Sequence, residues 1–219
     1  MTDRRNRLPL TCEDTVGPYY PLPFLDGDRM DLTRVHPGLA IRPAGEARVL
    51  AGRVLDRHGA LAHGVLLEFQ QADPAGAIRG PGGDGGVDPW FEGVARCRTD
   101  GTFRLRTLRP GPVAPERAPH VTLTIFSDGF ARLVTQIFFG GEAANAADPV
   151  LASLDPQEAA RLVAAPTGEA EDGAPVYALD IVLAGEGETP FFDDRPEAGV
   201  APSGAPSGAS SGAPAGAAA

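Results

Sequence analysis

The stretch that most constrains the fold runs from residue 117 to residue 139, because two β-rich runs lie close together in it. Val121, Leu123 and Ile125 alternate with polar residues, which is the pattern of a strand with one buried face. Residues 134–139 form the second β-rich run, and Ser127-Asp128-Gly129 between the runs has the composition of a turn. The sequence therefore predicts a β-hairpin around which the rest of the chain is built.

Other short β-rich runs end at Gly or Pro residues. Predicted strands cover 47–56, 64–71, 95–98, 103–108 and 176–183. Arg57-His58-Gly59 predicts a hairpin-like link between the first two runs, and Asp100-Gly101 is a strong hairpin signal between the next two. Arg104 and Arg106 make one face of the 103–108 run basic, and we expect that face to be solvated rather than to bind a ligand.

One short helix is expected after the central hairpin. Asp155 is a good N-cap, Pro156 suits the first turn, and Glu158 completes a capping box, so the predicted helix continues to Ala164. Pro166-Thr167-Gly168 is expected to end it. Many short strands and a single helix indicate a mostly β fold, an antiparallel β-sandwich or barrel.

Composition divides the chain into three parts. Residues 1–45 are rich in Pro, Asp and Arg and predict an extended N-terminal arm, stiffened around Gly17 and Pro18. Residues 46–195 form the predicted β-sandwich domain. Residues 196–219 consist mainly of Ala, Gly, Pro and Ser, a composition that buries too little apolar area to become ordered.

Charge and cysteine content bear on partners and location. The formal net charge of −10 argues against nucleic acid or an anionic membrane as a partner. No apolar run approaches the length of about 18 residues that a membrane span needs, and the first residues lack the apolar centre of a secretory signal. With only Cys12 and Cys97, the chain is expected to be cytoplasmic with reduced thiols.

Two motifs in the central hairpin carry a family resemblance. Residues 117–122 read Arg-Ala-Pro-His-Val-Thr, and residues 135–139 read Thr-Gln-Ile-Phe-Phe. Together they resemble the iron-binding core of the intradiol ring-cleavage dioxygenases, with Arg-Pro-x-His-x-His opening one strand and Thr-Gln-x-Tyr-Phe on the next. Residues 67–73 and 99–111 match further pieces of the family pattern, so the resemblance extends from about residue 15 to residue 193. It implies the β-sandwich of these enzymes.

The resemblance also bears on the metal site. Catalytic members of the family hold Fe(III) with two tyrosinates and two histidines. The matching motifs put Ile78 and Val113 at the tyrosine positions and Thr122 at the second histidine position, so that His120 is the only remaining equivalent. The resemblance therefore implies that this chain binds no metal and carries no catalytic residue. A lone histidine at a strand edge is in any case more often structural than a metal ligand.

One subunit type of the family has this pattern. Such an α-type subunit pairs with an iron-bearing β-type subunit, and the complex is expected to cleave protocatechuate with O₂ to 3-carboxy-cis,cis-muconate. Residues 185–193 are similar to the C-terminal signature of that subunit type. By the same resemblance Thr15, Gly17 and Pro18, in the extended arm, line the mouth of the partner's active site.

One departure concerns the substrate carboxylate. The α-type subunit usually carries an Arg that receives this carboxylate, and Asp128 stands at its position here. Because an aspartate repels an anion, either Arg132 or a partner residue supplies the positive charge, or the complex has an altered catechol specificity. Two alternatives of other kinds are a stand-alone β-sandwich binding module without catalysis and an independently active iron enzyme.

Overall fold

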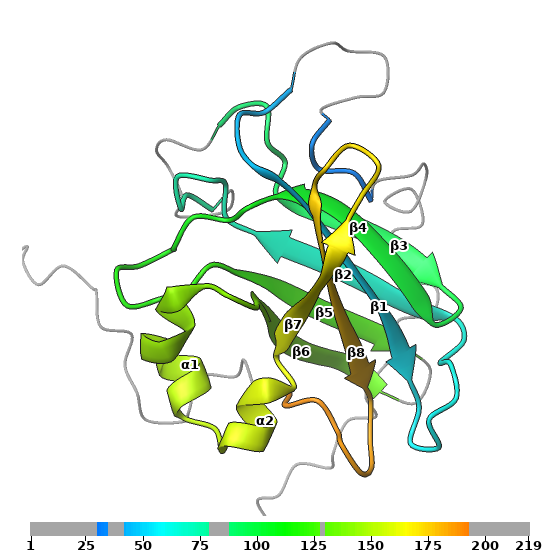
Figure 1. Cartoon of the computed structure of the whole chain (residues 1–219). Coiled ribbons are helices and arrows are strands. Elements are labelled where there is room, and N and C mark those ends of the chain that lie inside the picture. Colours follow the sequence, from blue (N-terminus) through cyan, green and yellow to red (C-terminus); the bar gives the residue numbers. More distant parts are fainter. Residues whose placement is uncertain (1–29, 35–41, 79–87, 128–129, 193–219) are drawn as a thin grey trace, which may run out of the picture.

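The computed structural model describes residues 30–34, 42–78, 88–127 and 130–192, and it is dominated by β-strands (Figure 1). The mostly β fold expected from the sequence is confirmed. The strands are β1 (Ala47–Leu55), β2 (Val65–Gln71), β3 (Val94–Thr99), β4 (Thr102–Leu108), β5 (His120–Ser127), β6 (Phe130–Phe139), β7 (Val163–Glu169) and β8 (Pro175–Val182). Three short helical segments, η3 (Ala143–Ala147), α1 (Pro149–Ala152) and α2 (Pro156–Ala160), lie between β6 and β7.

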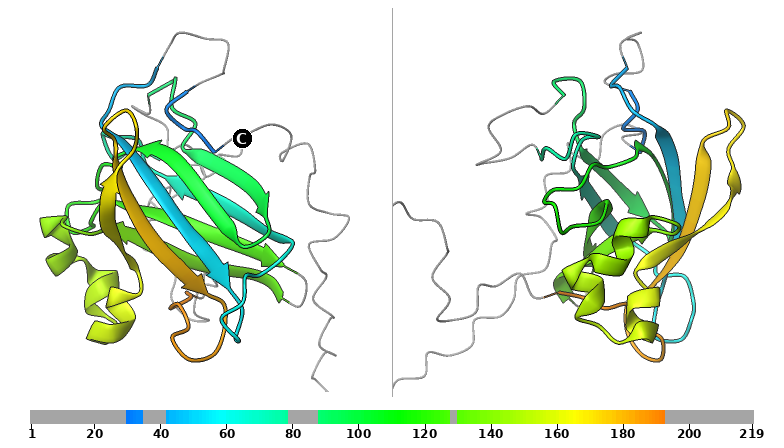
Figure 2. Two further views of the ribbon diagram at one scale, coloured as in Figure 1. Left: turned by 45° about the vertical axis from the view of Figure 1, so that its right-hand side comes forward. Right: turned by 60° about the vertical axis from the view of Figure 1, so that its left-hand side comes forward.

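The strands form one sheet in the order β3-β2-β5-β6-β7-β8-β1-β4. Only two residue pairs join β6 to β7, so the sheet folds at this point into two halves of four strands each. Figure 2 shows the two halves as facing layers, with the helices at one end. The pairing is mainly antiparallel, as expected for a β-sandwich, but β1 with β8 and β6 with β7 are parallel.

The main core lies between the two layers. Alternate residues of β5 point into it: Val121, Leu123 and Ile125 are fully buried, whereas His120 and Thr122 are only partly buried. The predicted hairpin of β5 and β6 is confirmed, because the two strands pair from His120↔Phe138 to Ser127↔Phe130. Each fully buried large apolar side chain contributes about 1.5–3 kcal/mol, so the alternation fixes which face of β5 turns outward.

A smaller apolar cluster lies on the outer face of the β5–β6 hairpin. It consists of Ala118, Phe138, Leu151 and Leu162, and the helical segments supply part of its cover. Phe138 and Phe139 face opposite sides of β6, since Phe139 belongs to the main core. The outward face of β5 at His120 is therefore next to a second, helix-covered core rather than open surface.

Two predicted hairpins are wrong in the same way. β1 pairs with β4 and β8, and β2 pairs with β3 and β5, so that only the bridge Leu55↔Leu61 follows the predicted pairing. The Asp100-Gly101 turn likewise joins β3 and β4 in different layers. Gly101 has φ +100°, and an added Cβ would lie 2.6 Å from Leu61 Cβ, so the turn is packed into the crossover between layers. A turn motif fixes local direction, but long-range packing decides the partner strand.

The predicted helix is too long. It ends at Ala160, and residues 163–169, expected to finish it, form β7. The capping box of Asp155 and Glu158 is present as predicted, but it stabilises only the first turn. After the helix, the backbone N–H of Phe138 donates to Leu162 O and that of Gly140 donates to Ala164 O, both at 2.8 Å. These residues therefore pair with the edge of β6 as a strand instead of continuing the helix. The sequence also missed η3 and α1, while β8 is where the alternation predicted it.

A short piece of the predicted arm is described and covers the free edge of β4. Leu32 N donates to Arg106 O and Arg106 N donates to Met30 O, both at 2.8 Å, and the Leu32 side chain is buried in the main core. Thr15, Gly17, Pro18 and the C-terminal tail lie outside the described residues, so their predicted roles stay predictions. In the described part of the chain, no helix has the length and apolar character that crossing a membrane requires.

Candidate functional site

His120 begins β5 and keeps the hydrogen bond typical of a metal-binding histidine. Its Nδ1 lies 2.8 Å from the carbonyl oxygen of Ala118. A carbonyl only accepts, so Nδ1 donates and Nε2 carries the lone pair of the neutral ring. Burial is the main cause that lowers the pKa of His120, and the ring also lies 5.5 Å from that of Phe138. His120 is therefore a neutral imidazole held in one orientation.

Thr122 is the next outward-facing residue of β5. It pairs with Gln136 on β6 and with Gln70 on β2, and its side chain is half-buried. The structure thus brings His120 and Thr122 to the same face, as the motif predicts. Together they offer one imidazole nitrogen and one neutral hydroxyl, and neither is the anionic oxygen donor that a hard trivalent ion prefers.

Arg117 and Asp148 form an ion pair close to His120, and the sequence analysis missed its carboxylate. The Asp148 side chain is 0% exposed, and its Oδ2 accepts from Arg117 Nε at 2.9 Å and from Ala118 N at 2.8 Å. Arg117 also donates to Gln136 Oε1 at 2.6 Å. We call Arg117, His120, Gln136 and Asp148 the retained corner. The Asp148-Pro149 pair, which repeats the Asp155-Pro156 helix start, is the signal that could have found it.

The second oxygen of Asp148 caps a helix. Oδ1 accepts from Val150 N at 2.9 Å, so one carboxylate fixes both the start of α1 and the residues that precede His120. Burial on its own would raise the pKa of Asp148, but the Ala118 and Val150 N–H groups and the Arg117 guanidinium outweigh it and hold the pKa below its usual range. Every charge of the retained corner has a partner inside the chain.

Ile78 and Val113 lie on two loops that are packed together. Gly111 N donates to Asp73 O at 2.9 Å, and Gly76, at φ +92°, lies so close to Pro112 that an added Cβ would be 2.2 Å from the Pro112 carbonyl oxygen. The side chains of Ile78 and Val113 are 40% and 37% exposed. Both are hydrocarbons, so these loops offer no ligand atom at the two positions.

The described residues contain no group of three or more His, Cys, Asp or Glu side chains that could hold a metal ion. Two residues of the central hairpin were predicted to bear on recognition of the substrate carboxylate, Asp128 and Arg132. Asp128 lies outside the described residues. Arg132 is exposed on β6, and the four residues that separate it from Gln136 correspond to about 13 Å along a strand, so Arg132 lies apart from the retained corner.

A second, largely buried ion pair, also missed from sequence, lies next to Phe139 at the C-terminal end of β6. The guanidinium of Arg48, on β1, packs against the rings of both Phe139 and Tyr177, 5.3 and 5.2 Å from their centroids, and its NH1 lies 3.0 Å from Glu142. Arg109 donates to the same carboxylate at 2.8 and 2.6 Å and is the main cause that lowers the pKa of Glu142. Because Arg109 opens the loop that carries Val113, this network ties that loop to the sheet.

The chain matches the dioxygenase family model over residues 16–185. It is 37% identical over 194 residues to the protocatechuate 3,4-dioxygenase alpha chain of Burkholderia cepacia. The aligned region covers 84% of this chain and 96% of that one. Identity to the alpha chain of Pseudomonas putida is 31%, over 85% of this chain and 97% of that one. The protocatechuate 3,4-dioxygenase beta chain of Burkholderia cepacia is 35% identical, over 81% of this chain and 80% of that one.

Solved structures agree with the fold. The dioxygenase domain of a carbohydrate-binding fusion protein from Streptomyces sp. SirexAA-E matches with a TM-score of 0.52 and 26% identity, over 71% of this chain and 99% of that one. Hydroxyquinol 1,2-dioxygenase from Pseudomonas putida DLL-E4 has the same fold, with a TM-score of 0.51 and 20% identity, over 80% of this chain and 68% of that one. The resemblance first read from the motifs around His120 is thus confirmed, and the chain belongs to the intradiol ring-cleavage dioxygenase family.

Proposed function

We propose that this chain is the metal-free α-type subunit of a protocatechuate 3,4-dioxygenase. Its partner is an iron-bearing β subunit. The complex breaks the bond between the two hydroxyl-bearing carbons of protocatechuate and incorporates both atoms of O₂ to give 3-carboxy-cis,cis-muconate. The isolated chain is inactive. The observation that carries the proposal is the set of side chains at the four family ligand positions: Ile78, Val113 and Thr122 replace three ligands, and only His120 is left.

The donor chemistry of these side chains supports the metal-free role. In the family the two tyrosinates supply the negative charge that a ferric ion requires, and Ile78 and Val113 supply none. A neutral His120 offers Nε2 as a single nitrogen ligand, and Thr122 would bind only as a neutral hydroxyl. The iron that the family uses therefore does not fit this chain, and its ring-cleaving chemistry belongs on the partner.

The contribution to the substrate pocket comes from the N-terminal arm. We propose that Thr15, Gly17 and Pro18 line the mouth of the β subunit's active site, where a proline-stiffened segment loses little entropy on docking. Asp128 at the position of the family Arg leaves the substrate carboxylate without its usual partner on this chain. Arg132 or a residue of the β subunit supplies that charge, or the complex accepts a different catechol.

The test is co-expression of the full chain with a β chain, such as that of Burkholderia cepacia, and with no partner. We expect the two chains to purify together and to convert protocatechuate with O₂ into a tricarboxylate product, whereas the single chain does not. Removing residues 1–20 should lower activity by at least tenfold, while removing residues 200–219 should leave it unchanged. Failure to bind any β chain would favour a stand-alone binding module.

Substrate choice is tested in the same complex. Protocatechuate and catechol differ by the carboxylate, so the ratio of their kcat/KM values measures its recognition. Arg132→Ala should lower that ratio about tenfold or more if Arg132 receives the carboxylate. An unchanged ratio in Arg132→Ala would eliminate Arg132, and a ratio below one in the unaltered complex would show an altered catechol specificity.

A further inference from the structure

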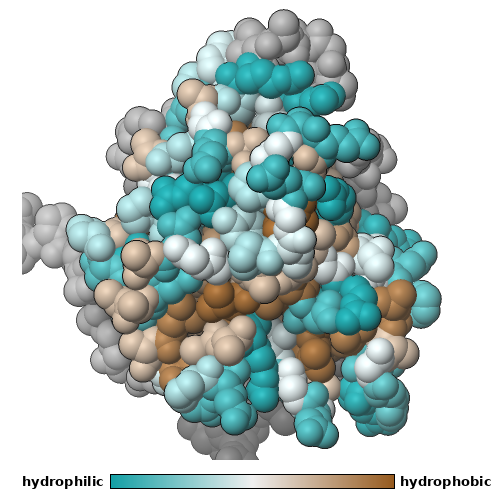
Figure 3. All heavy atoms as spheres, in the orientation of Figure 1, coloured by the Kyte–Doolittle hydropathy of each residue, from teal (hydrophilic) through white to brown (hydrophobic). Residues whose placement is uncertain are grey.

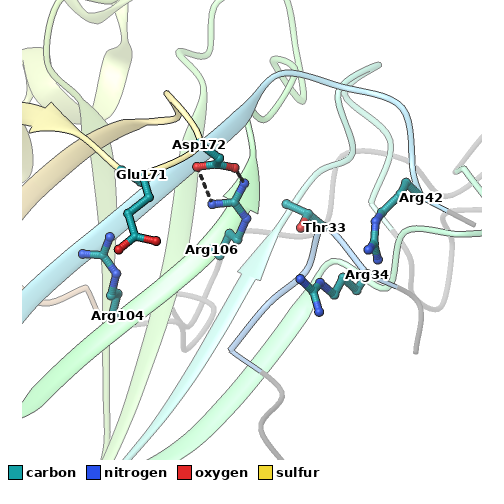
Figure 4. Close-up of a pocket in the computed structure, with 8 residues that line it drawn as sticks. Thr33, Arg34, Arg42, Arg104, Arg106, Glu171 and Asp172 are labelled. Carbon is teal, nitrogen blue, oxygen red and sulfur yellow. Dashed lines mark hydrogen bonds and ion pairs between the residues drawn. The ribbon is translucent and has the colours of Figure 1, made fainter. Parts of the chain in front are cut away.

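An open hollow of about 650 Å³ lies beside β4 (Figure 4), and none of its lining residues belongs to the retained corner. Four stretches of the chain line it: the segment that covers the edge of β4, the residues before β1, β4 itself, and the turn between β7 and β8. Four of its lining residues are arginines, Arg34, Arg42, Arg104 and Arg106. In a chain with a formal net charge of −10, so many guanidinium groups in one place are a local exception.

The frame of the hollow is held by hydrogen bonds. The pairing of Leu32 with Arg106 fixes the covering segment against β4. Within that segment Asp31 accepts from Thr33 N at 2.9 Å and pairs with Arg34 Nε at 3.1 Å, which orients the guanidinium of Arg34. On the opposite wall Ala170 N donates to Ala174 O at 2.8 Å and closes the β7–β8 turn. The β7–β8 turn lies among hydrophilic residues on the face shown in Figure 3.

The two walls differ in how their charges are balanced. Arg106 donates with both terminal nitrogens to Asp172, and the carboxylate of Glu171 points toward Arg104 (Figure 4). On the other wall Arg34 meets Asp31 through Nε and is half-exposed, and Arg42 forms no ion pair with a described residue. The wall of Arg34 and Arg42 thus keeps guanidinium groups available.

We propose that this hollow binds a small multivalent oxyanion, a polycarboxylate or a phosphate, with Arg34 and Arg42 as its main ligands. A guanidinium presents a planar fork that matches the two oxygens of a carboxylate or phosphate, and two forks on one wall favour an anion with more than one charge. The lining is almost entirely polar, with Ala170 as its apolar member, so an aromatic ring gains little there. The hollow is large enough for a small organic ligand.

One source of such an anion rests on the proposed function. Intradiol cleavage would turn a monocarboxylate substrate into a tricarboxylate product, and a site that selects by charge would bind the product and not the substrate. Free phosphate or another metabolic polycarboxylate is the other source. Binding to the full chain alone tests the site whether or not the complex is active, so failure of the proposed function and failure of this site give different results.

The experiment is isothermal titration calorimetry of the full chain at constant ionic strength, with inorganic phosphate, citrate, 3-carboxy-cis,cis-muconate, protocatechuate and benzoate. We expect saturable one-to-one binding of the multivalent anions, at least tenfold tighter than binding of the two monocarboxylates. Tightest binding of the muconate would identify the reaction product as the ligand, and tightest binding of phosphate or citrate would identify the other source.

Variants separate a built site from general attraction. The double variant Arg34→Ala/Arg42→Ala should weaken binding at least tenfold, and Arg34→Lys/Arg42→Lys should recover only part of it because lysine keeps the charge without the fork. Arg98→Ala removes an equally exposed arginine from β3, at the other end of the strand order, and should change nothing. No saturable binding, equal binding of benzoate, or an equal loss in Arg98→Ala would overturn the proposal.

Discussion

The retained corner and the arginine-lined hollow both bring arginines and carboxylates together, yet they differ in what those charges meet. In the retained corner Asp148 is fully buried and its partners, Arg117, Ala118 N and Val150 N, all belong to the chain. In the hollow Arg42 is exposed and has no ion pair with a described residue. Charges satisfied from within hold a fold together, whereas charges left open are available to a ligand. We therefore interpret the retained corner, which contains His120, as structural in this chain.

The sharpest way to break this contrast is to remove Asp148. Asp148→Ala leaves Arg117 half-buried without its carboxylate and uncaps α1, so we expect a loss of about 3–5 kcal/mol in the free energy of unfolding, measured in urea. Asp155→Ala is the matched control, because Asp155 caps α2 from an exposed position and should cost about 1 kcal/mol. Equal losses in the two variants would show that the corner is not a stabilising element.

The second buried pair should behave like the corner and not like the hollow. Glu142→Gln removes the charge that Arg48 and Arg109 share, and we expect a loss of about 2 kcal/mol at pH 7. The pKa of Glu142 is lower in the folded chain than its ordinary value, so its stabilisation is present above the unfolded pKa and is lost as pH falls through the folded one.

The pH dependence provides the check on that pair. Urea unfolding between pH 7 and pH 3 should show stability falling below about pH 4.5, and the fall should be shallower in Glu142→Gln than in the unaltered chain. Glu116→Gln, which removes an exposed carboxyl, should follow the unaltered chain. A Glu142→Gln profile parallel to that of the unaltered chain would contradict the role given to this carboxylate.

A smaller effect concerns His120. Burial lowers its pKa, so its ring should titrate below about 6.5 in an NMR titration, with the Nδ1 proton retained on the side of Ala118 O at neutral pH. The same titration of the chain unfolded in urea provides the reference. Titration of His120 at or above the value in the unfolded chain would mean that the ring is solvated and that the retained corner is open.

The smallest expected effect on stability is in the hollow. Arg42→Ala removes an exposed side chain without an ion pair to a described residue, so the free energy of unfolding should change by less than about 0.5 kcal/mol. A loss comparable with that of Asp148→Ala would place Arg42 among the structural charges, and the contrast between the two regions would disappear.

Local signals in the sequence predicted elements whose partners are close in the chain. The alternation of Val121, Leu123 and Ile125 and the turn after them were enough for the β5–β6 hairpin, and the capping box of Asp155 was enough for the start of α2. The wrong hairpins share one cause. Asp100-Gly101 does turn the chain, but the strands it joins bury their apolar faces from opposite layers, and nothing within ten residues of the turn encodes that choice.

The candidate site was predictable only in part. The motifs placed His120 and Thr122 on one strand face, as the structure has them. Asp148 is 31 residues from Arg117 in sequence, and Glu142 is 94 residues from Arg48, so their ion pairs depend on strand order and could not be read from spacing. The same holds for the hollow. From the sequence, Arg104 and Arg106 predict only a solvated face of a strand, and the fold brings Arg34, Arg42 and the β7–β8 turn next to them.

The central claim is that the chain has kept the family's scaffold without its metal. The most direct test is iron analysis, together with visible absorption, of the full chain purified alone and of each chain separated from the complex. We predict iron and the tyrosinate-to-iron absorption band in the complex and with the β subunit only. Stoichiometric ferric iron in the isolated chain, together with cleavage of catechols without a partner, would contradict the account.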